Sequence, residues 1–214
     1  MILACLDLEG VLVPEIWIEV AEATGVPELR RTTRDEPDYD KLMRYRLDLL
    51  ERKGIGIAEI SKVLEKVEPL PGAIEFLTWL RSRLPLVILS DTFFGFARPL
   101  LPRLGYPTIF CHELLVDADG RITGYKLRMP DQKRHSVKAF RSVGYDTIAA
   151  GDSYNDTAML GEANAGILFC PPANVIAEFP QFPVTRNYAE LRAAFEAAEQ
   201  RIVEGSGRIG ARAG

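Results

Sequence analysis

Carboxylates follow two short apolar segments that are far apart in the chain. Asp7 and Glu9 come directly after the apolar residues 2–6, and a second acidic run, Gly-Asp-Ser-Tyr-Asn-Asp at residues 151–156, comes directly after another apolar segment. Ligands of open α/β sheets bind in the crevice beyond the carboxyl ends of the strands. If both apolar segments are strands of one parallel sheet, the two groups of acids converge on that crevice.

Acids that converge in this way predict a bound cation. Two like charges about 4 Å apart repel each other by roughly 4 kcal/mol at an effective dielectric constant near 20, so the cluster needs a cation, protonation, or both. A site with only oxygen ligands favours Mg²⁺. Of the two acids in the second run, Asp152 is the better candidate for a metal ligand because it comes first after the strand. Asp156 is predicted not to bind the metal itself but to orient the residues that do.

Asp7 is the predicted nucleophile, because an ionised aspartate can attack phosphorus and form an acyl phosphate. Glu9 shares a face with Asp7 on extended backbone, and a protonated Glu9 could donate to the leaving oxygen. Both residues could instead be turn and N-cap residues that prepare the next helix. The same alternative applies to Ser153 and Asp152, although a helix N-terminus also favours anions.

Further candidate groups come from the middle of the chain. Ser90, which ends a third apolar run, could offer its hydroxyl and nearby backbone amides to phosphate oxygens, and Asp91 beside it is also assigned to substrate binding. Lys133 begins a predicted helix and could offset the phosphate charge. Asn155 could donate a hydrogen bond to the substrate. The basic residues that compete with Lys133 are Lys126, Arg134 and Lys138.

Composition excludes several classes of function. The 214-residue chain has a net charge of −4, which offers no basic surface for nucleic acid. Its apolar stretches are far shorter than the roughly twenty residues of a membrane helix, and the early acids interrupt any signal core. Three scattered cysteines, at positions 5, 111 and 170, are predicted to be buried reduced thiols of a cytoplasmic protein.

The order of the predicted elements is typical of an α/β protein. Apolar strand patterns alternate with helical ones, which predicts a parallel sheet covered on both faces. The predicted strands are 2–6, 86–89, 108–111, 147–150 and 165–169, and the predicted helices are 73–83, 98–104, 135–143 and 155–163. A β-hairpin is predicted from residues 113–116 and 122–127 around a glycine turn.

One long segment interrupts this alternation. Residues 14–68 contain no convincing strand and predict helices near 15–24, 40–52 and 57–65, which indicates a small helical cap over the crevice. Residues 1–13 and 69–203 would then form the core. Residues 204–214 have little to bury and are predicted to be a disordered tail.

Taken in order, Asp7-x-Glu9, Ser90, Lys133 and the run Gly151–Asp156 resemble the four motifs of the haloacid dehalogenase superfamily of phosphotransferases. The resemblance implies a Rossmann-like core, phosphorylation of Asp7, and Mg²⁺ held by Asp7, Asp152 and the backbone carbonyl of Glu9. The superfamily usually has aspartate at the position of Glu9. This difference does not affect a backbone ligand, but it places the proton-donating carboxyl about one methylene further out.

Within the superfamily, the helical insert resembles that of the phosphoserine phosphatases. Those enzymes bind the amino-acid part of the substrate with a glutamate and an insert arginine, and Glu15 and Arg46 match these positions. A zwitterion needs an acid for its ammonium and a planar guanidinium for its carboxylate. Arg44 competes with Arg46, and the alternatives are a first-turn glutamate and a solvated arginine.

The stretches 5–17 and 150–157 are similar to the bacterial bifunctional phosphoserine phosphatase/homoserine phosphotransferases, which share the Glu9 variation. This resemblance implies hydrolysis of phosphoserine and phosphoryl transfer to homoserine, with small molecules as partners and a homodimer as one possible assembly. Two alternatives stay open. One is a phosphatase of another small phosphomonoester, such as a sugar or nucleotide, and the other is a non-catalytic sensor of serine-like metabolites.

Overall fold

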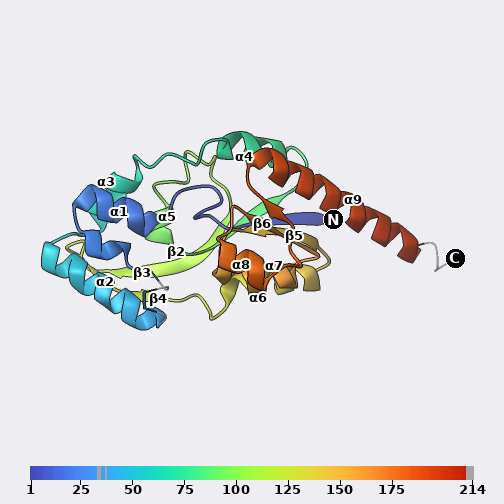
Figure 1. Ribbon diagram of the computed structural model, residues 1–214. Coiled ribbons are helices and arrows are strands. Elements are labelled where there is room, and N and C mark those ends of the chain that lie inside the picture. Colours follow the sequence, from blue (N-terminus) through green and yellow to red (C-terminus); the bar gives the residue numbers. More distant parts are fainter. Residues whose placement is uncertain (33–34, 37, 211–214) are drawn as a thin grey trace.

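A computed structural model describes residues 1–32, 35–36 and 38–210, with the backbone alone at 206–210. Within this part of the chain, a seven-stranded sheet has the order β4-β3-β2-β1-β5-β6-β7, and only the β3–β4 pair is antiparallel (Figure 1). The strands are β1 (Ile2–Leu6), β2 (Leu86–Phe93), β3 (Ile109–Val116), β4 (Ile122–Lys126), β5 (Asp146–Gly151), β6 (Ala165–Phe169) and β7 (Val184–Thr185).

Helices cover both faces of this sheet. Two of them, α4 and α9, lie on one face, whereas α6, α7 and α8 lie on the other (Figure 1). The helices outside the insert are α4 (Ala73–Arg81), α5 (Phe94–Ala97), α6 (Gln132–Ser142), the 3₁₀ turn η2 (Tyr154–Asp156), α7 (Thr157–Glu162), α8 (Ala173–Glu178) and α9 (Tyr188–Gly210).

The alternation of side chains along the central strands explains this arrangement. In β1, Ala4 and Leu6 pack into the cluster that contains α4 and α9, whereas Leu3 and Cys5 pack into the cluster that contains α6, α7 and α8. Successive side chains of a strand point to opposite faces, so a strand with apolar residues at every position requires cover on both. This confirms the predicted α/β fold with a mostly parallel sheet.

The segment between β1 and α4 contains helices and no strand among its described residues. Its elements are α1 (Ile16–Thr24), the 3₁₀ helix η1 (Pro27–Arg30), α2 (Tyr39–Lys53) and α3 (Ile57–Leu64). We call residues 14–68 the insert. Its contacts with the β3–β4 hairpin include two hydrogen bonds: the Ile57 N–H donates to the Gly120 carbonyl at 2.9 Å, and the Tyr125 hydroxyl bonds to the Asp40 carboxylate. The division into a core and a cap domain stays a prediction.

The structure corrects three of the predicted elements, the helix 98–104 and the strands 108–111 and 113–116. Residues 98–104 form turns, and the helix at this place is the shorter α5 just before them. Pro99 and Pro102 each lack a backbone N–H, so a regular helix cannot continue through them. The predicted strand 108–111 and the first hairpin arm, 113–116, are one continuous strand, β3.

Other corrections concern the C-terminal segment and the cysteines. Helix α9 continues through Gly210, so residues 204–210 are helical where a disordered tail was expected, and residues 211–214 lie outside the described residues. All three cysteines are free, but Cys111 is only partly buried and Cys170 is exposed at the end of β6. Among the described residues, no helix has both the length and the apolar character needed to cross a membrane.

Candidate active site

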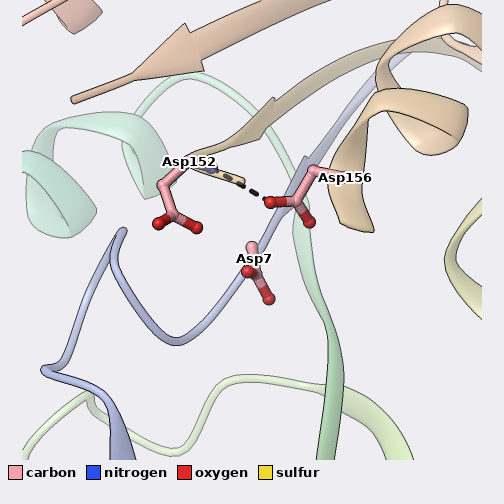
Figure 2. Close-up of side chains that lie close together, drawn as sticks. All are labelled: Asp7, Asp152 and Asp156. Carbon is pink, nitrogen blue, oxygen red and sulfur yellow. Dashed lines mark hydrogen bonds between the residues drawn. The ribbon is translucent and has the colours of Figure 1, made fainter. Parts of the chain in front are cut away.

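The two predicted acidic motifs meet at the carboxyl end of the central strands. Strands β1 and β5 pair in parallel with Leu6 opposite Ala150, and the Asp7 N–H donates to the Ala150 carbonyl at 2.9 Å. Asp152 follows the end of β5. Figure 2 shows the carboxylates of Asp7, Asp152 and Asp156 turned toward one another. Ligand oxygens of these three residues all lie within 4.8 Å of one another.

A buried lysine joins this acidic cluster. The Lys133 Nζ lies 2.9 Å from Asp7 Oδ1, 2.8 Å from Asp156 Oδ1 and 3.5 Å from Asp91 Oδ2. Burial disfavours the ammonium, but the attraction of the three carboxylates outweighs it and raises the pKa of Lys133. The structure therefore separates Lys133 from its competitors. Lys126 and Lys138 are exposed, and Arg134 bonds to Asp131.

The cluster is crowded with negative charge despite this lysine. Burial, followed by the neighbouring Asp156, raises the pKa of Asp7 well above its usual range. Burial also raises the pKa of Asp152 to about 7, with contributions from Asp156 and Glu15. Carboxylates that are held together against their own repulsion provide the donor set that a hard divalent ion prefers. The residues present therefore fit Mg²⁺, although which of them bind it stays a prediction.

Gly10 allows the two motifs to approach each other. It has a left-handed backbone with φ of +74°, and a Cβ at this position would lie 2.4 Å from Cγ of Asp152. A side chain here would both strain the backbone and displace the Asp152 carboxylate. The loop is also anchored from the far end of the chain, because the Tyr188 hydroxyl of α9 donates to the Val11 carbonyl at 2.7 Å.

Asp156 uses both of its carboxylate oxygens within the protein. Oδ1 accepts from Lys133, whereas Oδ2 accepts from the backbone N–H groups of Asp152 at 3.0 Å and Ser153 at 3.1 Å, and from the Ser153 hydroxyl at 3.2 Å. The side chain is fully buried. These contacts place Asp156 where it can hold the loop that carries Asp152. Asn155, by contrast, is exposed, and among the described residues it makes no hydrogen bond to this network.

Ser90 and Asp91 lie near the end of β2, beside the cluster. Ser90 is buried, and its Oγ accepts from the Thr92 N–H at 3.2 Å. The half-exposed Asp91 faces Lys133 and also lies near two buried side chains that the sequence analysis missed. The Gln132 Nε2 is 3.2 Å from Asp91 Oδ1, and the His112 Nε2 is 3.7 Å from it.

The second of these missed residues, His112, is held as a neutral ring. Burial lowers its pKa, and its Nδ1 accepts from the Arg128 backbone N–H at 3.1 Å. Because Nδ1 is an acceptor, the proton of the neutral ring is on Nε2, which faces Asp91. Neither His112 nor Gln132 carried a signal in the sequence beyond being a single polar residue near a predicted strand or helix.

Glu9 lies in the loop between β1 and the insert and has an unusual environment for an acid. Its Oε2 accepts from the Ile16 N–H, the first residue of α1, at 2.9 Å. Burial raises the pKa of Glu9 to about 8, and the nearby carboxylate of Glu15 adds to this shift. One Glu9 oxygen therefore does cap a backbone N–H at the start of α1, as the helix-capping alternative from the sequence predicted. This contact is compatible with a proton on the other Glu9 oxygen at neutral pH.

One arginine of α2, Arg46, packs against the Trp17 side chain of α1 within the insert. Arg46 is 6 % exposed, its guanidinium lies 4.4 Å from the centre of the Trp17 ring, and its Nη2 donates to the Arg31 carbonyl at 2.6 Å. Its Nε has no hydrogen-bond partner among the described residues. Burial lowers the pKa of Arg46 to about 10. Arg44, the competing residue, is exposed on the same helix.

Glu15 is exposed, and its negative charge contributes to the raised pKa values of Glu9 and Asp152. The same charge opposes the lowering of the Arg46 pKa by burial. Of the predicted site residues, the structure brings together Asp7, Asp91, Lys133, Asp152 and Asp156, and Ser90 is adjacent to Asp91 in the chain.

Comparison with known families agrees with this arrangement. A model of the haloacid dehalogenase-like hydrolases matches residues 3–164, which span both acidic motifs. The chain belongs to this family. This match confirms the resemblance to haloacid dehalogenase-like hydrolases that the motifs indicated.

The relatives of this hydrolase include proteins named phosphoserine phosphatases. One, from Pseudomonas syringae pv. tomato, is 57% identical over 199 residues, which cover 93% of this chain and 84% of the relative. Another, phosphoserine phosphatase ThrH of Pseudomonas aeruginosa, is 56% identical over 201 residues, covering 94% and 98%. A solved phospho-aspartyl intermediate analogue of phosphoserine phosphatase has the same fold, with a TM-score of 0.73, 23% identity and coverage of 91% and 97%.

Proposed function

We propose that this hydrolase is a Mg²⁺-dependent phosphoserine phosphatase that works through a phosphorylated Asp7 and can also transfer the phosphoryl group to homoserine. The observation that carries the proposal is the position of Asp7, which lies 2.9 Å from the buried ammonium of Lys133 and within 4.8 Å of Asp152. A nucleophilic carboxylate, a fixed positive charge and a further acid for a metal thus meet at one point.

The oxygen donors at this point fit a divalent ion. Asp7, Asp152 and the backbone carbonyl of Glu9 would hold Mg²⁺, and Asp156 would orient the loop of Asp152 through its two hydrogen bonds to backbone N–H groups. When bound, the ion would neutralise phosphoryl oxygens and orient the phosphate for in-line attack.

In the first half of the reaction, Asp7 attacks phosphorus. The bond between an Asp7 carboxylate oxygen and phosphorus forms while the bond between phosphorus and the seryl oxygen breaks. Glu9 gives its proton to the departing seryl oxygen. Ser90 and Lys133 bind the phosphoryl oxygens, over which the negative charge is spread in the transition state, and hold them in position.

In the second half, the acyl phosphate on Asp7 is discharged. Glu9, now ionised, takes a proton from the attacking hydroxyl, and the new oxygen–phosphorus bond replaces the bond to Asp7. Water gives free phosphate, whereas the side-chain hydroxyl of homoserine gives phosphohomoserine. Closure of the insert over the crevice would favour the second outcome by excluding water.

Recognition of the amino-acid part is assigned to the insert. Within the described part of the chain, the Nε of buried Arg46 is a donor without an acceptor, and the carboxylate of phosphoserine or homoserine would supply one. Glu15 would accept from the substrate ammonium. Asp91 and Asn155 are assigned to substrate binding as well, with Asp91 acting next to Lys133 and Asn155 from the exposed side of the crevice.

One experiment tests the whole proposal. The purified protein is incubated with phosphoserine and Mg²⁺, with and without homoserine, while free phosphate and phosphohomoserine are measured. We expect phosphate in both reactions and phosphohomoserine only with homoserine. If no phosphohomoserine forms, the result contradicts only the proposed transfer to homoserine and not the phosphatase activity. A screen of small phosphomonoesters in which sugar or nucleotide phosphates are turned over faster than phosphoserine would contradict the substrate assignment.

A further inference from the structure

The first turn of α6 has to be fixed firmly, because it carries Lys133. Its N-cap residue, Asp131, has a left-handed backbone with φ of +48°, and its side chain accepts no capping hydrogen bond from a backbone N–H of that turn, although it does bond to the Arg134 side chain. The ordinary means of fixing a helix start is therefore absent here. Another contact must determine where the first turn of α6 lies relative to the strand ends.

Gln132 makes that contact, directly beside Lys133. Its side chain is buried, with the residue 1 % exposed, and its Nε2 donates to the Ser90 carbonyl at 2.6 Å and to Asp91 Oδ1 at 3.2 Å. Its Oε1 accepts from Arg128 Nη2 at 2.6 Å. Both ends of the amide are thus paired, which is the condition under which a buried polar side chain defines a single arrangement.

The stretch of β2 that receives these hydrogen bonds needs such support. The pairing of β2 with β3 shifts register between Leu89 and Phe93, because Leu89 lies opposite Phe110 and Phe93 lies opposite His112. Residues within a bulge of this kind lose their regular ladder partners. Ser90 and Asp91 lie in that irregular stretch, so the amide of Gln132 replaces a missing ladder contact.

Arg128 decides which way the amide of Gln132 points. A guanidinium has only donors, so the oxygen of the amide must face it and the NH₂ group must face Ser90. Arg128 is itself held by the Ser136 hydroxyl at 2.8 Å and lies over the Phe110 ring, 5.2 Å from its centre. The orientation of the Gln132 amide is therefore determined by Arg128, a residue outside the crevice.

We infer that Gln132 is a positioning residue for the phosphoryl-transfer site, oriented by Arg128. It fixes the Ser90–Asp91 stretch against the start of α6, and so sets the distance between the two groups assigned to the phosphoryl oxygens, Ser90 and Lys133. The inference rests on the proposed phosphoryl transfer but not on the identity of the amino-acid substrate.

The test compares Gln132→Met, Arg128→Met, the double variant, and Lys138→Met as a control on the exposed face of α6. Steady-state kinetics are measured with phosphoserine and with an aryl phosphate, which does not need the amino-acid subsite. We expect Gln132→Met to lower kcat about tenfold to a hundredfold on both substrates, because small displacements of positioned groups have effects of this size. Arg128→Met should lower kcat about threefold to tenfold, and Lys138→Met should leave it unchanged.

Two further readouts separate positioning from general loss of structure. The double variant should have the kcat of Gln132→Met within about twofold, because Arg128 acts through Gln132 and residues in one network are not additive. The Mg²⁺ concentration for half-maximal activity should stay within about twofold of wild type, since Gln132 contacts neither Asp7 nor Asp152. If the Gln132→Met protein does not fold, the Arg128→Met variant is sufficient to test the inference, because the Arg128 side chain is exposed.

A wild-type kcat in Gln132→Met, or in Arg128→Met, would overturn the inference, as would multiplicative effects in the double variant. Failure of the proposed substrate gives a different result. In that case the wild-type protein hydrolyses the aryl phosphate but not phosphoserine, and the variants still differ on the aryl phosphate.

Discussion

The crevice at the strand ends and the polar face of the insert differ in how complete they are. In the crevice, Lys133 already contacts three carboxylates, and Asp156 has both oxygens paired. In the insert, Arg46 is just as deeply buried, but its Nε has no partner among the residues that the structure describes, and Glu15 is exposed. The groups that we assign to the chemical step are thus pre-arranged, whereas the Arg46 Nε that we assign to recognition has a donor left for the substrate to pair.

The largest expected effect comes from removing the nucleophile in the crevice. Asp7→Asn should lower phosphate release by about four orders of magnitude or more, because an amide cannot form the acyl phosphate. The fold should persist, since Lys133 keeps Asp156 and Asp91 as partners. Phosphate release and the thermal unfolding midpoint are measured on the same sample. Turnover near wild type in a folded Asp7→Asn protein would remove Asp7 from the chemistry.

The next effect concerns the ion that the crevice is expected to hold. At about 100 times its dissociation constant, Mg²⁺ should stabilise the wild-type protein by about 2.7 kcal/mol. For a chain of this size, that corresponds to a rise in Tm of roughly 5–10 °C. Asp152→Asn should abolish most of this rise, which thermal unfolding measures without any substrate. An equal rise in the variant would show that Asp152 does not bind the ion.

A smaller and more selective effect is expected from the insert. Arg46→Ala should raise KM for phosphoserine about a hundredfold, since truncating one partner of a buried charge pair costs about 2–5 kcal/mol, while KM for an aryl phosphate should change little. Arg44→Ala is the matched control, because Arg44 is exposed on the same helix, and it should leave both constants unchanged. Equal effects of Arg46→Ala on the two substrates would remove Arg46 from amino-acid recognition.

The smallest effect should come from the exposed acid. Glu15→Gln is expected to raise KM for phosphoserine by about fivefold at low salt, because an exposed ion pair contributes only about 0–1 kcal/mol and is screened by salt. The difference between Glu15→Gln and wild type should shrink at high ionic strength, whereas that between Arg46→Ala and wild type should not. A Glu15→Gln effect that is independent of salt would indicate that Glu15 is desolvated when the substrate binds.

The sequence predicted the parts of the crevice that follow a simple rule. Acids directly after apolar strands meet at one sheet edge, so the proximity of Asp7 and Asp152 could be expected, and their geometry agrees with it. Gln132 and His112 could not be predicted in this way, because each is a single polar residue whose partners come from a different strand or loop. Their contacts depend on the bulge in β2, which no local pattern indicates.

The errors in the predicted secondary structure also have physical explanations. Apolar spacing favoured a helix at 98–104, but the two prolines in that stretch remove backbone donors, and turns form instead. The glycine-rich end of the chain suggested disorder from composition, yet the backbone of α9 continues to Gly210 as an extension of a helix whose earlier residues Leu191 and Phe195 are buried. Composition describes what a segment can bury by itself, not what a preceding helix imposes on it.

The central place of β1 has a consequence for the time at which the protein becomes active. Strand β1 leaves the ribosome well before its two neighbours in the sheet, β2 and β5, are synthesised. Parallel pairing between segments so distant in sequence is slow, because the intervening chain must be closed into a loop first. A nascent chain that ends before β5 therefore carries Asp7 without Asp152 or Asp156, so the acidic cluster cannot assemble until β5 and the loop after it have been synthesised.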